Sequence, residues 1–304
     1  MSVEIFEESR RVLAGVAYRI LGSAADAEDV VQEAWLRWSE VDASRVEDPR
    51  AYLIRVTSRL AIDRLRKVKA RREAYVGPWL PEPISTEPGL AEHVELADSV
   101  DLALLVVLET LSPLERAVFV LREAFGMSYV EIGEVIGRAE PATRQLARRA
   151  RDHVHERRPR FDVDRAERRK VTERFIGACS GGDVDGLLEL LAQNVRLVAD
   201  GGGKARAPVR VIEGAGKVAR FLDAAASESG VLRFLASLGL PGTMVYEVRT
   251  AEVNGGPAAI VTLDGKPITV ISLLLSGGLV QTVYLIANPD KLAQLGGPGT
   301  TESV

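Results

Sequence analysis

The sequence predicts a multidomain fold, in which two all-α domains, the second a helix-turn-helix, are followed by an α+β domain. Three observations predict it. A basic amphipathic run without internal Gly or Pro spans residues 50–73. Two capping boxes and a glycine turn precede an arginine-rich helix between residues 112 and 157. After residue 166, helical patterns give way to apolar runs typical of strands, which is the order of an α+β domain.

Composition restricts the class of protein. At 304 residues the chain is long enough for two or three domains, and 46% hydrophobic residues allow ordinary cores. Cys179 is the only cysteine, which excludes an intramolecular disulfide framework and a Cys-based zinc cluster. No signal peptide or apolar run of about 18 residues occurs. We therefore expect a cytoplasmic protein with no membrane partner, no metal and no cofactor.

The first predicted domain, residues 1–73, begins with a helix at 3–21 and a second helix capped by Ser23. The second helix is acidic and carries aromatic residues. It presents Asp26, Asp29, Gln32, Glu33 and Trp35. Such a helix is either a docking surface for a basic partner or an ordinary bundle helix with Trp35 and Trp38 in the core.

A basic helix follows, with Asp48 as cap and Pro49 in the first turn. It holds nine Lys or Arg and two acids from Arg50 to Glu73, whereas the preceding 48 residues hold eleven acids and five bases. Its apolar face comprises Leu53, Val56, Leu60, Ala61, Leu65 and Val68. Ile62 and Arg64 do not fit this face. The helix either contacts a polyanion or is simply solvated.

Residues 74–100 are predicted to be a linker, because four prolines and two glycines between Tyr75 and Leu90 prevent regular structure. Trp79 and Leu80 are costly to expose, so we expect the segment Trp79, Leu80, Pro81, Glu82 and Pro83 to lie against a folded surface.

Residues 101–160 form the second predicted domain. Ser112–Glu115 and Ser128–Glu131 are capping boxes, and a further helix begins near Glu140. Its expected inner face is Ala142, Leu146, Ala150 and Val154, and its outer face is Arg144, Gln145, Arg148, Arg149 and Arg151. This pattern indicates a helix-turn-helix, with a helical hairpin and a solvated arginine face as the alternative.

Residues 166–304 form the third predicted domain, with fourteen acids and fourteen bases. Helices are expected at 166–180, 183–191 and 214–226, and an antiparallel sheet from strands at 195–198, 209–212, 243–248, 258–263, 269–275 and 279–286. The terminal GGPGTTESV is expected to be disordered.

The order of these segments resembles the extracytoplasmic-function (ECF) sigma factors of bacterial RNA polymerase. AYRILGSAADAEDVVQEAWLRW resembles the part of sigma region 2 that binds core polymerase. PRAYLIRVTSRLAIDRLRKVKARR resembles the part that melts and reads the minus-ten element. LSPLERAVFVLREAFGMSYVEIGEVIG with RQLARRARDHV resembles sigma region 4. The resemblance implies that Asp26, Asp29, Gln32, Glu33 and Trp35 bind core RNA polymerase, and that promoter DNA is the other partner.

The resemblance also implies two sets of DNA contacts. The minus-ten set is Arg50, Tyr52, Arg55, Arg59, Arg66 and Lys69. Many related sigma factors have Asn at the position of Arg59. Asn suits a bidentate contact to a base edge, whereas Arg suits phosphate or guanine, so the resemblance leaves the minus-ten sequence open. The minus-thirty-five set is Thr143, Arg144, Gln145, Arg148, Arg149 and Arg151.

Three further segments resemble the SigJ-type group, in which a SnoaL-like C-terminal domain is fused to the sigma factor. They are Trp79–Pro83, then Asp200, Gly201, Gly202, Gly203 and Lys204, and then Asn288, Pro289 and Asp290 followed by Lys291 and Leu292. The resemblance implies a cone-shaped α+β domain and a regulatory interface at these segments. A ligand of unknown identity in the cone is an open possibility.

Two other functions are compatible with the residues. A ligand-sensing helix-turn-helix regulator would bind operator DNA without polymerase. An isomerase-like or cyclase-like enzyme would need an acid or base in the cone, and the last domain contains no His. We expect no catalytic residues. Cys179 is either a redox sensor or a buried structural thiol.

Overall fold

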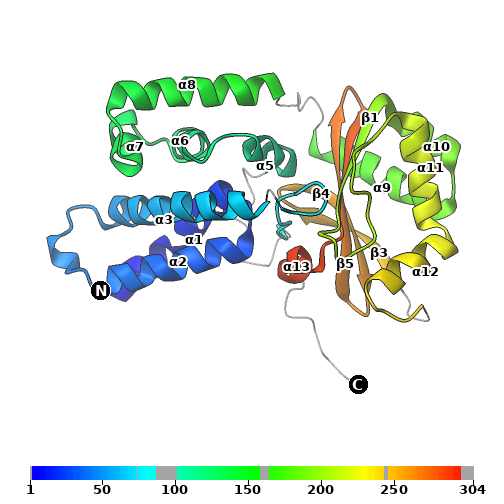
Figure 1. Ribbon diagram of the computed structural model, residues 1–304, viewed down its shortest axis with the longest axis horizontal. Helices are drawn as coiled ribbons and strands as arrows, with labels where there is room; N and C mark the ends of the chain where they lie inside the picture. Colours follow the sequence, from blue (N-terminus) through cyan, green and yellow to red (C-terminus); the bar gives the residue numbers. More distant parts are fainter. Residues whose placement is uncertain (1, 73, 87–100, 158–163, 243–245, 296–304) are drawn as a thin grey trace. The chain divides into compact units, whose positions relative to one another are not determined.

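The computed structural model describes residues 2–72, 74–86, 101–157, 164–242 and 246–295 (Figure 1). The chain divides into two compact units. The first comprises Met1–Ala74 and Ala91–Arg158, and the second comprises Tyr75–Leu90 and Pro159–Val304. The first half of the predicted linker therefore belongs to the same unit as the C-terminal domain. Residues 87–100, the rest of the predicted linker, and the C-terminal tail lie outside the described residues.

The first part of unit one is a bundle of α1 (Ser2–Leu21), α2 (Ala24–Ser39) and α3 (Pro49–Arg72), with a short 3-10 turn, η1 (Ala43–Arg45). The predicted caps are present: the Ser23 hydroxyl accepts from the Asp26 N–H at 3.0 Å, and the Asp48 carboxylate accepts from the Ala51 N–H at 2.9 Å. These bonds satisfy donors that the first turn of a helix leaves open.

Most of the predicted apolar face of α3 is buried, as Leu53, Leu60, Ala61 and Leu65 show. Ile62, which did not fit that face, is also buried because α3 contacts α1 and α2 and additionally α6 and α7. The sequence pattern predicted one buried face for α3, whereas helices pack against more than one side of it.

The second part of unit one contains α5 (Leu102–Glu109), α6 (Pro113–Glu123), α7 (Tyr129–Ile136) and α8 (Glu140–Arg157). Both predicted capping boxes are formed. Gly137 ends α7 with φ 67°, and a Cβ on Gly133 would lie 2.6 Å from the Arg138 carbonyl oxygen, so the tight turn requires glycine there.

The inner face of α8 differs from the prediction by about one residue. Its buried side chains are Thr143, Ala147, Ala150 and Val154. Ala142 is exposed and Leu146 is half-buried. The short side chains of Ala142, Ala147 and Ala150 do not distinguish the two faces in sequence.

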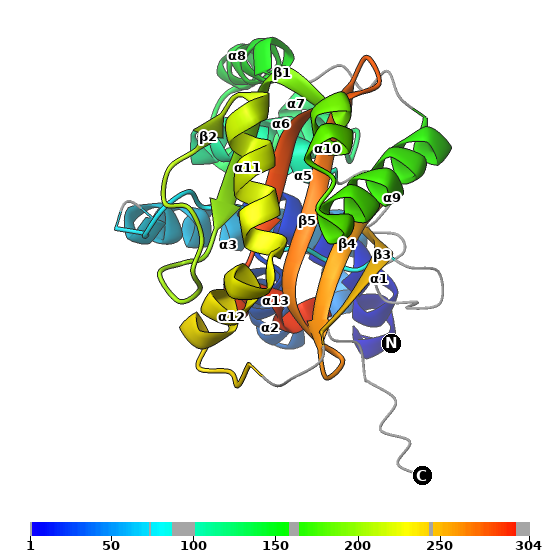
Figure 2. The ribbon, with the colours of Figure 1, turned by 90° about the vertical axis from the view of Figure 1, so that its right-hand side faces the viewer.

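Unit two is a mixed six-stranded sheet with helices on one face (Figure 2). The helices are α9 (Arg165–Gly181), α10 (Val184–Leu190), α11 (Ala215–Ala226) and α12 (Glu228–Ser237), with α13 (Pro289–Leu292) and η2 (Ala293–Leu295) at the end. The strands are β1 (Leu191–Asp200), β2 (Ile212–Glu213), β3 (Tyr246–Val253), β4 (Gly256–Leu263), β5 (Lys266–Ser276) and β6 (Leu279–Ile286).

The sheet order is β2-β1-β6-β5-β4-β3, and β1 pairs with β6 in parallel. The expectation of a wholly antiparallel sheet was wrong at this pair, because the last strand of the β3–β6 meander runs in the same direction as β1. Helix α12 was not predicted, although Ser227 caps it through the Gly230 N–H. Residues 243–245 of the predicted strand 243–248 lie outside the described residues.

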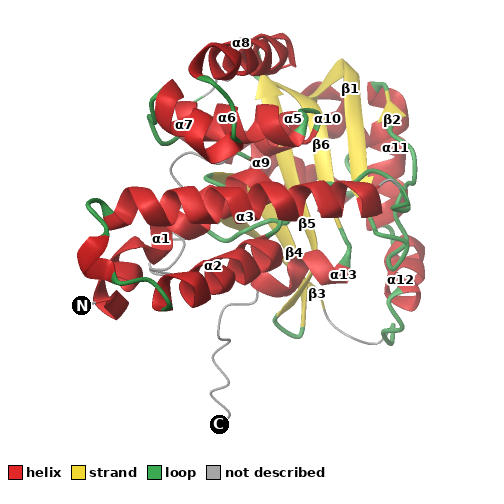
Figure 3. Ribbon diagram, turned by 60° about the vertical axis from the view of Figure 1, so that its left-hand side comes forward, coloured by secondary structure: helices red, strands yellow, loops and turns green. Residues whose placement is uncertain are grey.

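A hydrophobic core lies between the sheet and its helices, around Phe175, Leu187, Leu197, Leu222 and Val283. The linker crosses the sheet on the side away from α9, α11 and α12 (Figures 1 and 3). It is anchored at the carboxyl ends of β1 and β3, which lie on opposite sides of β6, β5 and β4. Among the described helices, none is both long and apolar enough to cross a membrane.

Candidate functional site

The fully buried carboxylate of Asp200, at the end of β1, holds the linker. Its Oδ1 accepts from the Tyr75 hydroxyl at 2.6 Å. Its Oδ2 accepts from the Leu80 N–H at 2.8 Å and pairs with the Lys291 ammonium at 2.6 Å. The glycine turn begins directly after this buried acid. These contacts compensate the desolvation that a buried charge suffers.

Lys291 is the matching cation, and it is also buried. Its ammonium donates to the Leu80 carbonyl oxygen and lies 3.7 Å from the centre of the Trp79 ring. The Tyr75 ring centre is 5.1 Å from the same ammonium. A desolvated cation against two aromatic faces adds a cation–π attraction to the ion pair.

Asn288 completes the group. Its side-chain amide donates to the Tyr75 hydroxyl oxygen at 2.7 Å, and its side-chain carbonyl accepts from the Asp290 N–H at 3.1 Å, where Pro289 starts α13. Burial, followed by the hydrogen bond to the Asp200 carboxylate, raises the pKa of Tyr75 above its ordinary value. We call the set Tyr75, Trp79, Leu80, Asp200, Asn288 and Lys291 the linker lock.

The glycine turn allows the backbone to approach the linker closely. Gly202 has φ 59°, and a Cβ there would lie 2.4 Å from the Asn288 side-chain nitrogen and 2.8 Å from the Tyr75 oxygen. A Cβ on Gly203 would meet Val76 at 3.3 Å. Beside the turn, Lys204 and Asp290 form an exposed ion pair at 2.6 Å. Glycine is thus required by both conformation and space.

A second anchor lies farther along the linker. The Ile84 N–H donates to the Asn254 side-chain oxygen at 3.3 Å, and the Asn254 N–H donates to the Ile84 carbonyl at 3.0 Å. The Thr86 N–H donates to the Glu252 carbonyl at 2.8 Å. Between the anchors, Pro81, Glu82 and Pro83 are buried. Sequence reasoning missed Asn254, because Asn-Gly between two strands suggests only a hairpin turn.

The two tryptophans of the acidic helix α2 have different environments. Trp38 is fully buried and donates to the Ser2 carbonyl at 2.8 Å, whereas Trp35 is half-buried with its ring 5.0 Å from that of Phe6. Gln32 and Glu33 are exposed, and Glu33 pairs with Arg37 at 2.8 Å.

Arg64, which did not fit the face of α3, ties the two helices together. Its guanidinium donates to Asp26 at 2.8 Å and to Asp29 at 2.8 Å. The hydrogen bond to Asp26 raises the pKa of Arg64. Asp26 is therefore partly structural, while Asp29 keeps most of its surface exposed.

The basic side chains of α3 have different environments. Arg50 and Arg66 are exposed. Lys69 is half-buried and donates to the carbonyl oxygens of Glu109 and Leu111, and its burial lowers its pKa. Tyr52 stacks near Trp38, with ring centres 5.8 Å apart.

Arg55 and Arg59 contact the end of α7. Arg55 pairs with the Glu134 carboxylate at 3.3 Å, and Arg59 donates to the Glu134 and Val135 carbonyls at 2.7 and 3.3 Å. In this conformation the two arginines are engaged with the helix-turn-helix rather than presented freely.

The outer face of α8 is exposed at Arg144, Gln145, Arg148, Arg149 and Arg151. Thr143 is a correction: it is fully buried, and its hydroxyl donates to the Ala139 carbonyl at 3.2 Å, so it cannot reach a base edge. Tyr129 orients two of the arginines, since Arg144 lies 4.8 Å above its ring and Arg151 donates to its hydroxyl at 2.6 Å.

A buried charge network that the sequence did not reveal joins α6 to the bundle. Arg116 is fully buried, donates to the Arg19 carbonyl at 3.0 Å and pairs with Glu109. Arg72 also pairs with Glu109 and donates to the Leu21 carbonyl at 2.8 Å. Charged residues are usually solvated, so sequence alone assigned none of these a buried role.

A cavity of about 670 Å³ lies between the sheet and helices of unit two. The residues that line it include no Asp, Glu or His, the usual general acids and bases. Burial raises the pKa of the Cys179 thiol in its wall to about 12, which favours the inert thiol over a redox sensor. The described residues contain no group of three or more His, Cys, Asp or Glu suited to a metal.

Comparisons with known proteins agree with this arrangement. Residues 5–72 match sigma-70 region 2, and residues 101–154 match sigma-70 region 4. The chain is 39% identical over 301 residues to the ECF RNA polymerase sigma factor SigJ of Mycobacterium tuberculosis, covering 96% of this chain and 93% of SigJ. It is 36% identical to the probable ECF RNA polymerase sigma factor SigI of the same species, covering 95% of each.

The solved structures extend the match to the C-terminal domain. The crystal structure of Mycobacterium tuberculosis SigJ superposes with a TM-score of 0.76 at 37% identity, covering 97% of this chain and 99% of that one. At this coverage the match includes both helical domains and the C-terminal α+β domain. The chain therefore belongs to the ECF sigma factors, which bind core RNA polymerase and direct promoter recognition in transcription initiation, and which are not enzymes.

Proposed function

We propose that the C-terminal domain controls this sigma factor from within the same chain, by holding the linker between the two promoter-reading regions. The observation that carries the proposal is the buried Asp200 carboxylate, which binds Tyr75, Leu80 and Lys291 at once. A flexible tether has no need of a buried ion pair.

The physical basis is the length of the segment between regions 2 and 4 that is not bound to the C-terminal domain. Regions 2 and 4 must reach two promoter elements together, so the free length and stiffness of the segment between them affect that reach. With residues 75–86 bound along the sheet, only the segment after Thr86 remains to span the distance to α5. Release of the linker lock lengthens the tether, which makes the lock a two-state element of the kind that regulation requires.

The surfaces for polymerase and DNA follow from exposure and charge. For core polymerase we assign Asp29, Gln32, Glu33 and Trp35 on α2, with Asp26 mainly supporting Arg64. For the minus-thirty-five element we assign the exposed α8 side chains Arg144, Gln145, Arg148, Arg149 and Arg151.

For the minus-ten element we assign Arg50, Arg55, Arg59 and Arg66, with Tyr52 and Lys69 in supporting positions. Arg55 and Arg59 must leave α7 before they bind DNA. Phosphate contacts by these arginines give an affinity that falls steeply with salt. A role with core polymerase places the protein in the cytoplasm.

Transcription in vitro with purified core polymerase tests the proposal. Wild-type protein must yield promoter-dependent transcript, and its absence from every candidate promoter would contradict the sigma-factor function. Lys291→Met, which breaks the linker lock, should change the yield at least about threefold, whereas Lys217→Met, at an exposed lysine of α11, should leave it unchanged. Equal yields from both variants, with both folded, would refute control through the lock.

A further inference from the structure

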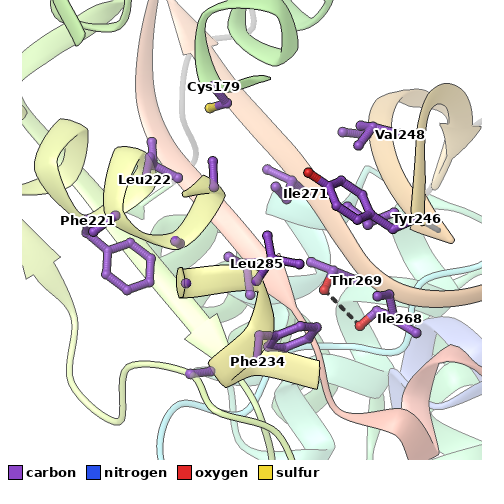
Figure 4. A pocket seen from close by; sticks show the side chains of 18 of the residues that line it. Cys179, Phe221, Leu222, Phe234, Tyr246, Val248, Ile268, Thr269, Ile271 and Leu285 are labelled. Atoms are coloured by element: carbon purple, nitrogen blue, oxygen red, sulfur yellow. Dashed lines mark hydrogen bonds between the residues drawn. The ribbon is translucent and has the colours of Figure 1, made fainter. Parts of the chain in front are cut away.

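The cavity in unit two is a mainly apolar chamber with walls from both layers of the domain (Figure 4). The sheet contributes Val261 and Ile271, and the helices contribute Phe175, Leu222 and Phe234. Its volume of about 670 Å³ falls within the range of small-molecule sites, roughly 300–1,000 Å³. A mainly apolar, partly open space of this size favours a molecule with a large hydrophobic part.

Few polar groups line the chamber. The Tyr246 ring projects from β3 into the space beside Ile271 and Thr269, as Figure 4 shows. The Thr269 hydroxyl donates to the Ile268 carbonyl at 2.8 Å, so its hydrogen is already used. With no carboxylate or imidazole in its walls, and with a protonated Cys179, the cavity is equipped to bind a molecule and not to transform it.

Two arginines among the lining residues carry charge. Arg206 and Arg233 are exposed lining residues, and no described carboxylate forms an ion pair with either. The Arg206 backbone lies beside α12, because its N–H donates at 2.8 Å to the hydroxyl of Ser237, one helical turn after Arg233. Two guanidinium groups without an acidic partner attract an anion.

We propose that this cavity binds a free amphipathic molecule with an apolar skeleton and one anionic group, such as a carboxylate. The skeleton lies against Val261, Ile271 and Phe234, and the anion faces Arg206 and Arg233. Binding is reversible and involves no covalent step. This inference concerns a ligand site and stands whether or not the linker lock controls transcription.

The same loop serves the cavity and the linker lock. Asp200 and the glycine turn are followed directly by Ala205–Pro208 in the cavity wall, and the Ala205 N–H donates to the Gly201 carbonyl at 3.0 Å. A molecule held by Arg206 is therefore bound six residues from the acid that holds the linker.

Isothermal titration of the full-length protein with decanoate, decanol and decylamine tests the chemistry of the site. Decanoate should bind at least about tenfold more tightly than decylamine, because the charged lining residues Arg206 and Arg233 are both positive. The double variant Arg206→Ala/Arg233→Ala should weaken decanoate about tenfold and decanol by less than about twofold. The control is Arg210→Ala, an exposed arginine outside the cavity wall, which should change neither.

A second variant tests the location. Val261→Trp fills the chamber and should weaken decanoate and decanol alike. Unchanged decanoate binding to a folded Val261→Trp variant would place the ligand elsewhere and overturn the proposal. Equal affinities for decanoate and decylamine, no effect of the double arginine variant, or no binding of decanoate to wild-type protein would each overturn it as well.

Discussion

Asp200 and Lys291 form a buried ion pair in which each charge depends on the other. Replacing Asp200 with Asn leaves the Lys291 ammonium buried without its counter-charge. Such a loss costs about 3–5 kcal/mol. We therefore predict that Asp200→Asn lowers the free energy of unfolding of the C-terminal domain by about that amount, measured by urea denaturation.

The control for this variant is Lys204→Ala, which breaks the neighbouring but exposed pair with Asp290. Its cost should stay below about 1 kcal/mol. If the two variants lose equal stability, Asp200 is no more important than a surface charge and the linker lock is not a stabilising unit.

The raised pKa of Tyr75 predicts that the free energy of unfolding depends on pH in the alkaline range. Its pKa is raised in the folded protein by burial and by the Asp200 carboxylate, so the folded state holds the phenolic proton more tightly than the unfolded state does. The stability that this provides is complete below the unfolded pKa of about 10 and is lost as pH rises toward the higher folded value.

The comparison is between wild type and Tyr75→Phe, which has no phenolic proton to lose. The wild-type free energy of unfolding should fall more steeply above about pH 10 than that of the variant. Parallel curves over that range would show that Tyr75 ionises equally in both states. The Phe variant should also lose about 1 kcal/mol at neutral pH with the hydrogen bonds to Asp200 and Asn288.

At the scale of elements, the outer face of α8 should read the minus-thirty-five element. Arg148 is highly exposed and makes only a loose pair with Asp152 at 3.8 Å, so Arg148→Ala should scarcely change stability. A lost base contact costs roughly 1–3 kcal/mol of discrimination between minus-thirty-five sequences. Competition between promoters that differ only in this element measures the effect, with Arg157→Ala on the same helix as control.

A different result would show a structural role for Arg148. If Arg148→Ala lowered the affinity for core polymerase as much as the preference for the minus-thirty-five sequence, α8 would not be the reading element.

The acidic helix α2 should carry polymerase binding. Glu33→Lys reverses an exposed charge that pairs with the exposed Arg37 one helical turn away, so the melting temperature should change little. Affinity for core polymerase should fall at least about tenfold, since like charges across an interface are costly. Glu8→Lys, an exposed reversal on α1, is the control. If Glu33→Lys instead lowered the melting temperature as strongly as the affinity for core polymerase, Glu33 would only support the helical bundle.

Features that depend on local sequence could be predicted, whereas features that depend on long-range packing could not. The caps at Ser23, Ser112 and Ser128 follow from local hydrogen-bond geometry, so they could be placed in advance. The buried position of Thr143 depends on how α8 packs, and a stripe of alanines carries little information about that. The parallel pairing of β1 with β6 is a long-range choice that no local pattern specifies.

At the scale of the whole chain, the candidate regulatory contacts were predictable because their residues were anomalous. Trp79 and Leu80 are too apolar for a tether, and three successive glycines after an acid indicate a close backbone approach. The pairing partner of Asp200 was not predictable. Lys291 is distant in sequence, and only the folded sheet brings the end of β1 beside α13.

A double-mutant cycle between Trp79→Ala and Lys291→Met, read out as promoter-dependent transcription in vitro, tests control through the linker lock most directly. Trp79 stacks on the Lys291 ammonium, so both substitutions open the same lock. Each alone should change the yield at least about threefold, and Trp79→Ala in the Lys291→Met background should change it by less than about twofold. If the two effects instead multiply independently in folded proteins, the linker and the C-terminal domain are not coupled, and the proposed control is contradicted.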